Sequence, residues 1–213
     1  MEDVAFEGTS GIRSLELAGW RRLTAEMYAK VRELSESDPK LAWQRYRETR
    51  SEMFRSHPQS PLAPERKVSF REIEYFPYDP AWRLRVPPAL ISVESERRVI
   101  DVELPEGRLR FRRFATVSVE VSTLTLFSVE GYGGGLFLPF KDRTNGSGTY
   151  GGGRYLYDTI KGADLGAGPG SIILDFNFAY NPSCAYSRDW VCPLAPAENS
   201  LPFALEAVER AFT

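Results

Sequence analysis

The chain has 213 residues, of which 42% are hydrophobic and 26% charged, and its net charge is −2 at pH 7. These values are typical of a globular protein and exclude a chain that is disordered throughout. The net charge provides no long-range attraction to nucleic acid. No run approaches the roughly 18 apolar residues of a membrane helix, and the N-terminus lacks the basic and apolar regions of a signal peptide. We therefore expect a cytoplasmic protein with reduced thiols that binds neither nucleic acid nor membranes.

Two helices are predicted in the N-terminal region. Between residues 11 and 35, apolar side chains at intervals of three and four residues form one stripe of a helix. They are Trp20, Leu23, Met27, Val31 and Leu34. Asp38 and Pro39 then provide an N-cap followed by a proline at the first helical position. A second helix is expected over residues 41–54, before the proline-rich segment 58–64.

After residue 68 the apolar pattern changes to a period of two, which is typical of β-strands. Strands are expected over residues 68–76, 98–104, 108–114, 135–140, 154–160 and 171–180. The run from 115 to 130 changes phase, because the valines up to Val121 share one parity and the leucines from Leu124 share the other. A turn or bulge near Ser122 and Thr123 therefore divides it into two strands. Residues 201–212 fit either a strand or a helical turn.

The order of the elements predicts an α+β fold. An N-terminal helical hairpin packs on an antiparallel sheet, which is either barrel-like or a sandwich, because the strands follow one another without intervening helices. The helical hairpin would comprise residues 1–62 and the antiparallel β domain residues 63–213. The proline cluster between them is too short for a flexible linker, so the two parts are expected to form one compact unit.

Residues 146–151, GSGTYG, match the spacing of a dinucleotide-binding motif. That motif requires a helix after its glycines, whereas residues 154–160 have the pattern of a strand. Asn145 and Gly146 form a dipeptide that is typical of hairpin turns. The preferred interpretation is a glycine-rich loop between strands, and no cofactor is expected.

Arginines alternate with apolar side chains over residues 108–114. Arg108, Arg110 and Arg112 share one strand face, while Phe111 lies on the other. Interleaved arginine and aromatic residues can bind nucleic acid. Here the ring points away from the arginines and an acidic segment precedes them, so a solvated face paired with acidic neighbours is favoured.

Both cysteines lie in the proline-rich segment 175–199, and His57 is the single histidine. Cys184 as a nucleophile with His57 as its base would make a cysteine-dependent hydrolase or transferase, provided that the thiol has a lowered pKa. The seven residues between Cys184 and Cys192 also suit a closed loop. Reduced thiols would instead be small buried apolar groups, and such structural roles are preferred. Zinc sites space their cysteines more closely, so no metal site is expected.

Polar side chains gather in and beside the aromatic and proline-rich segments. Asp175 lies within an apolar strand, where a carboxylate needs a charged or hydrogen-bonding partner. Arg154 is a candidate partner, because a guanidinium can hold a carboxylate with two hydrogen bonds. An ion pair that braces loops is favoured over a site for a ligand anion. The residues expected to contact such a ligand are Asp142, Tyr150, Arg154, Asp175, Asn177 and Asn181.

Five segments have distinctive sequences: HPQSPL, YFPYDP, LFLPFKDRTNGSGTYGGGRYLYD, DFNFAYNPSCAY and CPLAPAEN. In this order they resemble an uncharacterised bacterial and archaeal family catalogued as domain of unknown function 1684. The resemblance runs from residue 40 to the end of the chain. It implies a shared fold and no established activity, and its motifs include Arg154, Asp175, Asn181 and both cysteines. The chain departs from the family at Ser183, where a proline is usual, and over residues 206–212.

The leading functional hypothesis is a small-molecule binding protein. A polar pocket at one end of the sheet, built from residues 76–80, 139–155 and 175–199, would bind a small anionic ligand. Arg154 would be the charged anchor, and the two asparagines would supply hydrogen bonds. A cysteine-dependent enzyme and a structural or interaction protein without a small-molecule site are the alternatives. The oligomeric state is not predicted.

Overall fold

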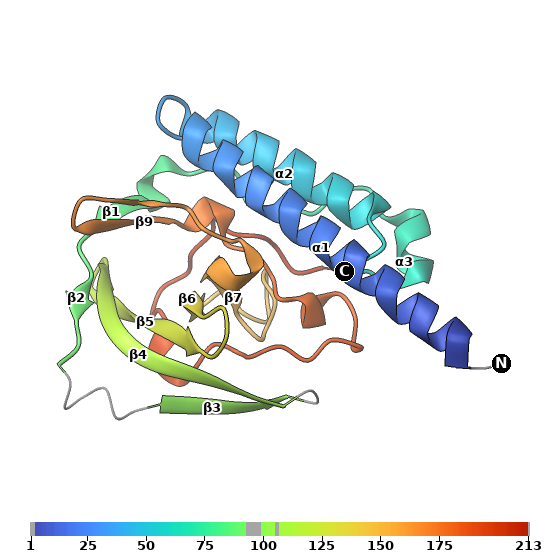
Figure 1. Cartoon of the computed structure of the whole chain (residues 1–213). Coiled ribbons are helices and arrows are strands. Elements are labelled where there is room, and N and C mark those ends of the chain that lie inside the picture. The colour runs from blue at the N-terminus through green and yellow to red at the C-terminus, as the bar shows by residue number, and fades with distance from the viewer. Residues whose placement is uncertain (1–2, 93–98, 105–106, 213) are drawn as a thin grey trace.

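The structure is a computed structural model that describes residues 3–92, 99–104 and 107–212. A helical hairpin lies along one side of a β-rich region (Figure 1). Its helices are α1 (Asp3–Leu34) and α2 (Pro39–Ser56), and a short α3 (Pro64–Ser69) follows. The predicted cap of α2 is confirmed, since the carboxylate of Asp38 accepts a hydrogen bond from the Leu41 backbone N–H at 2.9 Å. No helix in the described ranges is long and apolar enough to cross a membrane.

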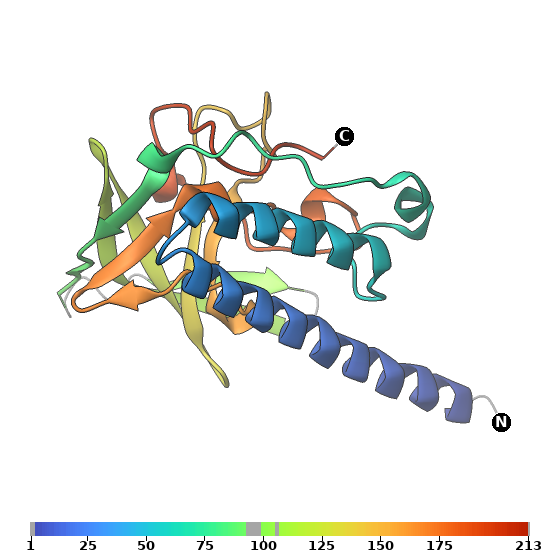
Figure 2. The ribbon, with the colours of Figure 1, turned by 90° about the horizontal axis from the view of Figure 1, so that it is seen from above.

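The apolar stripe of α1 is largely confirmed. Met27, Tyr28 and Val31 are buried against the rest of the protein. Leu23, expected in the stripe, is 39% exposed, and Thr24 is buried in its place, because the buried face is rotated by one residue. Seen from above, the N-terminal part of α1 extends beyond the other elements (Figure 2).

The strands form two antiparallel sheets. The larger has the order β2-β4-β5-β6-β7, with β3 also paired to β4, and the smaller has the order β1-β9-β8. The strands are β1 (Arg83–Val86), β2 (Ala89–Leu90), β3 (Val99–Leu104), β4 (Gly107–Val119), β5 (Ser122–Glu130), β6 (Gly135–Phe140), β7 (Arg154–Asp158), β8 (Ala167–Gly168) and β9 (Ser171–Asp175). The described strands form no closed barrel, so the arrangement is sandwich-like and the α+β prediction is confirmed.

The phase change between residues 115 and 130 marks a tight hairpin. β4 ends at Val119 and β5 begins at Ser122, so the turn lies at Glu120 and Val121, two residues before the predicted position. Glu120 adopts a left-handed backbone conformation with φ 51°. The pairing of β4 with β5 also shifts its register between Arg113 and Ala115. Such an irregularity allows β4 to bend there without ending the strand.

The arginine face of β4 is paired with acidic side chains, as predicted. Arg108 Nε lies 2.7 Å from Glu103 Oε1 of β3. Arg110 Nε lies 2.8 Å from Asp101 Oδ1 of the same strand. These exposed pairs occupy the guanidinium groups and give this face no excess of positive charge.

Two strand predictions were wrong. Residues 68–76 contain the end of α3 and an extended segment, whose Tyr75 forms an isolated bridge with Glu209 of the C-terminal segment. Asp175 does not lie inside a strand: it ends β9 and caps a short 3-10 turn, η4 (Phe176–Phe178), by accepting from the Asn177 backbone N–H at 3.2 Å. Residues 201–212 form neither a helix nor a strand in the structure.

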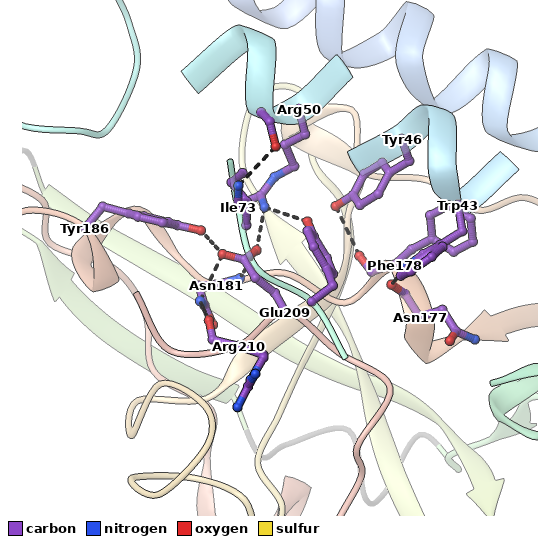
Figure 3. Close-up of polar contacts among 12 residues, drawn as sticks. Trp43, Tyr46, Arg50, Ile73, Asn177, Phe178, Asn181, Tyr186, Glu209 and Arg210 are labelled. Atoms are coloured by element: carbon purple, nitrogen blue, oxygen red, sulfur yellow. Dashed lines mark hydrogen bonds and ion pairs between the residues drawn. The ribbon is translucent and has the colours of Figure 1, made fainter. Parts of the chain in front are cut away.

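The helical hairpin shares its core with the β region. Buried side chains of α1 and α2, including Tyr28 and Tyr46, belong to the same apolar cluster as residues of β4 to β7 and β9. Two hydrogen bonds fix the contact: Trp43 Nε1–H donates to the Asn177 carbonyl at 3.1 Å and Tyr46 Oη–H to the Phe178 carbonyl at 3.2 Å. α2 is therefore held against η4 by both apolar and polar contacts (Figure 3).

Candidate ligand-binding site

A buried ion pair joins α2 to the C-terminal segment (Figure 3). Arg50 is 7% exposed and Glu209 is fully buried, and Arg50 Nη1 donates to Glu209 Oε2 in a close contact. The same nitrogen donates to the hydroxyl of Tyr75 at 2.8 Å. A charge pair removed from water in this way is stable only when its remaining hydrogen-bonding groups are also satisfied.

Three further hydrogen bonds satisfy the Glu209 carboxylate. Asn181 donates its backbone N–H to Oε2 at 3.0 Å and its Nδ2–H to Oε1 at 2.9 Å. The Tyr186 hydroxyl donates to Oε1 in a close contact. Burial raises the pKa of Glu209, while Arg50 and the Asn181 donors act in the opposite direction. The network therefore gives the buried Glu209 carboxyl group both a charged partner and hydrogen-bond donors.

A hollow opens on the Glu209 side of the network. We call it the arginine hollow; its volume is about 200 Å³, and it is lined by residues 66, 69–74, 186 and 209–212. Glu209 and Tyr186 form its buried floor. Two of its arginines lie over aromatic rings: the Arg66 guanidinium is 4.8 Å from the centre of the Phe212 ring, and that of Arg210 is 5.1 Å from the Phe76 ring.

A second, smaller cavity opens on the Arg50 side. We call it the tyrosine cavity; its volume is about 80 Å³, and Tyr28, Tyr46, Tyr155 and Tyr180 are among its lining residues. It lies between the helical hairpin and residues 155–183. The two hollows thus lie beside one shared ion pair, since Arg50 and Asn181 line the tyrosine cavity and Glu209 lines the arginine hollow.

Arg154 and Asp142, both expected to contact ligand, form a buried ion pair with each other. Arg154 is 0% exposed, and its Nη2 donates to Asp142 Oδ2 in a close contact. Arg154 Nη1 also donates to Asn145 Oδ1 at 2.9 Å and to the hydroxyl of Thr149. The prediction that Arg154 pairs with Asp175 was wrong. The partner is Asp142, and the ion pair braces the loop between β6 and β7.

Asp175 and Asn177 brace the start of β1. The Arg83 guanidinium lies 3.8 Å from Asp175 Oδ2, and Asn177 Nδ2 donates to Asp175 Oδ1 at 2.8 Å. Asn177 also exchanges two hydrogen bonds with the backbone of Asp79, at 2.8 and 2.9 Å. Burial raises the pKa of Asp175 to about 6. Asn181, by contrast, lies at the candidate site itself.

The two thiols lie near Tyr150, away from His57. The hydroxyl of Tyr150 is 3.5 Å from Cys184 Sγ, and both cysteines are free and partly buried. His57 ends α2, where its ring packs on Trp20 with centroids 5.3 Å apart. Within the described ranges, no hydrogen bond or ring contact joins His57 to Cys184. The proposed cysteine–histidine pair is therefore not assembled in this structure.

Four residues of the network were not predicted from the sequence: Arg50, Tyr75, Tyr186 and Glu209. For Arg50 a signal was present: it follows Tyr46 by four residues and precedes Phe54 by four, so it lies on the buried face of α2. A charged residue on an apolar helix face requires a buried partner. Nothing near Arg50 in the sequence identifies that partner, because Glu209 is 159 positions away.

Comparisons with known proteins place the chain in a family. The model of a family described as "Protein of unknown function (DUF1684)" matches residues 68–210. The chain belongs to this family. A solution NMR structure of an uncharacterised protein of Haloarcula marismortui resembles it with 33% sequence identity and a TM-score of 0.54, covering 78% of this chain and 91% of that one. No curated protein matches the chain. The DUF1684 membership confirms the resemblance in sequence, and neither finding indicates an activity.

Proposed function

We propose that this DUF1684 protein binds a small anionic molecule in the arginine hollow. The observation that carries the proposal is that three arginines, Arg66, Arg71 and Arg210, line one hollow of about 200 Å³. Guanidinium groups bind carboxylates and phosphates through paired, charge-assisted hydrogen bonds. The sequence-based hypothesis also expected a small anionic ligand, but it placed the binding arginine at Arg154. The present proposal assigns that role to the arginines of the hollow.

The charges around the arginine hollow favour an anion. Its lining also contains Glu72, Glu74 and Glu209. The buried Glu209 is offset by Arg50, so three rim cations face two outward carboxylates. Of these, Glu72 lies 3.8 Å from Arg47 on the neighbouring helix, and Glu74 lies 3.9 Å from Arg210, so each is offset in part. The local balance is therefore positive although the whole chain is slightly acidic.

The walls of the hollow suit an organic anion. Phe70 and Phe212 line it beside the arginines, and their ring centroids lie 6.4 Å apart. Stacking of Arg66 on Phe212 limits the freedom of the guanidinium. A ligand with an anionic head and a short apolar body would use both kinds of wall.

Titration with small anions tests this proposal. Isothermal calorimetry with succinate, benzoate and inorganic phosphate is expected to show saturable binding of at least one of them. Arg71→Met should weaken that binding by about tenfold, which is the loss of one charge-assisted hydrogen bond. Arg71 is exposed and no described residue forms an ion pair with it, so the variant should remain folded.

Arg143→Met is the matched control, because Arg143 is exposed and lies outside the hollow. It should bind the anions as the unchanged protein does. Equal weakening by both variants would reveal non-specific charge attraction. An absence of saturable binding by every anion would instead favour a structural or interaction protein.

A cysteine-dependent enzyme is the second candidate, and one observation favours it. A hydrogen bond with Cys192 and another with Tyr150 lower the pKa of Cys184 to about 6, against the opposing effect of burial. A thiol with this pKa is a thiolate at neutral pH and is nucleophilic. Tyr150, not His57, would be its neighbouring proton donor.

Alkylation measures this thiol directly. We expect the rate of reaction of Cys184 with iodoacetamide to rise with pH and to reach half its maximum near pH 6. Cys192→Ala removes the hydrogen-bond donor and should move the midpoint toward the ordinary thiol value of about 8.5. Cys184→Ser, followed by mass spectrometry, identifies the reacting residue. A midpoint of the unchanged protein at the ordinary value would eliminate the enzyme hypothesis.

A further inference from the structure

The tyrosine cavity contains a buried hydrogen-bond acceptor that is not used. Asn181 lines the cavity and is 1% exposed, yet its Oδ1 has no hydrogen-bond partner among the described residues. Buried polar atoms in folded proteins nearly always have a partner, so one that lacks it needs an explanation.

The orientation of the Asn181 amide is fixed. Its Nδ2 donates to Glu209 Oε1 at 2.9 Å and to the Arg210 carbonyl at 2.8 Å. Both of these partners are acceptors, so exchanging the amide oxygen and nitrogen would place an acceptor against two acceptors. Oδ1 therefore remains the acceptor, and a group that satisfies it must bring an N–H or O–H.

The rest of the lining combines apolar wall with polar side chains, which include Thr24, Arg50, Lys161, Tyr180 and Ser183. Met27, Met53 and Phe54 supply apolar wall. Two tyrosine hydroxyls donate to the protein itself, that of Tyr46 to the Phe178 carbonyl at 3.2 Å and that of Tyr155 to the Pro193 carbonyl at 2.5 Å. Water alone would solvate the apolar wall poorly. A small molecule with an apolar body and one hydrogen-bond donor matches both the wall and the Asn181 acceptor.

The charges that line the cavity are already balanced. Arg50 is paired with Glu209, and Lys161 lies 3.4 Å from Asp158 Oδ2. An added cation would be repelled by Arg50 and Lys161. An added anion would have to compete for these cations with Glu209 and Asp158, which already pair with them. A neutral occupant avoids both costs.

We propose that the tyrosine cavity is a second binding site, which takes a small neutral molecule. Its amide N–H or hydroxyl donates to Asn181 Oδ1, and its apolar body packs against the aromatic and methionine side chains. The volume of about 80 Å³ limits the enclosed part to a few heavy atoms. The site is independent of the arginine hollow, whose proposed ligand is charged.

A matched pair of probes tests the role of Asn181. Isobutyramide and methyl isopropyl ketone have the same shape and the same carbonyl, but only the amide has N–H donors. Two-dimensional NMR of nitrogen-labelled protein follows the side-chain signals of Trp20 and Asn181, both of which line the cavity. We expect saturable shifts with isobutyramide, with a dissociation constant in the millimolar range, and at least about tenfold weaker binding of the ketone.

A blocking variant locates the binding. Ser183 lines the cavity and is only partly buried, so Ser183→Leu should fill the opening and abolish the shifts. Ser187→Leu lies one turn further on, outside both hollows, and should leave binding unchanged. Equal affinity for amide and ketone, or no saturable shift with isobutyramide, would overturn the proposal. Both results come from the unchanged protein, so they stand even if Ser183→Leu fails to fold, and neither depends on anion binding in the arginine hollow.

Discussion

Arg154→Met is expected to lower the free energy of unfolding by about 3–5 kcal/mol. Arg154 is fully buried, and its removal would leave the carboxylate of Asp142 without a cation in the interior. The hydrogen bonds to Asn145 and Thr149, which hold the loop between β6 and β7, would be lost as well. Urea denaturation followed by circular dichroism measures this change.

Two variants separate the ion pair from its surroundings. The double variant Arg154→Met with Asp142→Leu removes both charges and should recover most of the loss, because no uncompensated charge remains. Arg143→Met, at an exposed position in the same loop, should have little effect. If Arg154→Met were as stable as Arg143→Met, Arg154 would not have the structural role assigned to it.

Arg50→Met is expected to cost a similar amount, about 3–5 kcal/mol at neutral pH, and the cost should shrink as the pH falls. Burial raises the pKa of Glu209, and Arg50 is the principal group that opposes this. Without Arg50 the folded-state pKa rises further, while the unfolded value stays near about 4.3. A carboxyl group with a raised folded pKa stabilises the fold below its unfolded pKa, and this contribution is lost as pH rises through the folded pKa.

The stability of Arg50→Met relative to the unchanged protein is therefore measured at several pH values from neutral down to mildly acidic. Arg45→Met is the control on the same helix, because Arg45 forms an exposed ion pair with Glu48 at 2.9 Å. A deficit that does not change with pH would contradict the assignment of Glu209 as the uncompensated group.

We also propose that the hairpin and the β domain unfold together, so tryptophan fluorescence and circular dichroism should give one midpoint.

The Arg50–Glu209 pair also relates this chain to its family. The DUF1684 match spans residues 68–210 and so contains Glu209 but neither helix of the hairpin. The buried Glu209 is paired with Arg50, which α2 provides. Within this chain, the hairpin is thus the source of the cation that the family region needs at its C-terminal end.

Local pattern was sufficient for much of the fold. The cap formed by Asp38 and Pro39, the helices on either side of it and the alternating strands β4 to β7 all follow from spacing within a few residues. These elements are predictable because backbone conformation and side-chain periodicity are determined by near neighbours. The pattern failed at residues 68–76. Apolar and polar side chains alternate there, but none of the described strands pairs with the segment, and Tyr75 forms an isolated bridge with Glu209.

The functional assignments required the tertiary structure. The sequence singled out Arg154, Asp175 and Asn181 as residues that would contact a ligand, and all three are buried. Their partners were decided by the fold: Asp142 for Arg154, Arg83 for Asp175 and Glu209 for Asn181. Burial makes a charged group need a partner, and residue type reveals that need. The choice of partner depends on which chain segments meet, and this is decided by packing over the whole molecule.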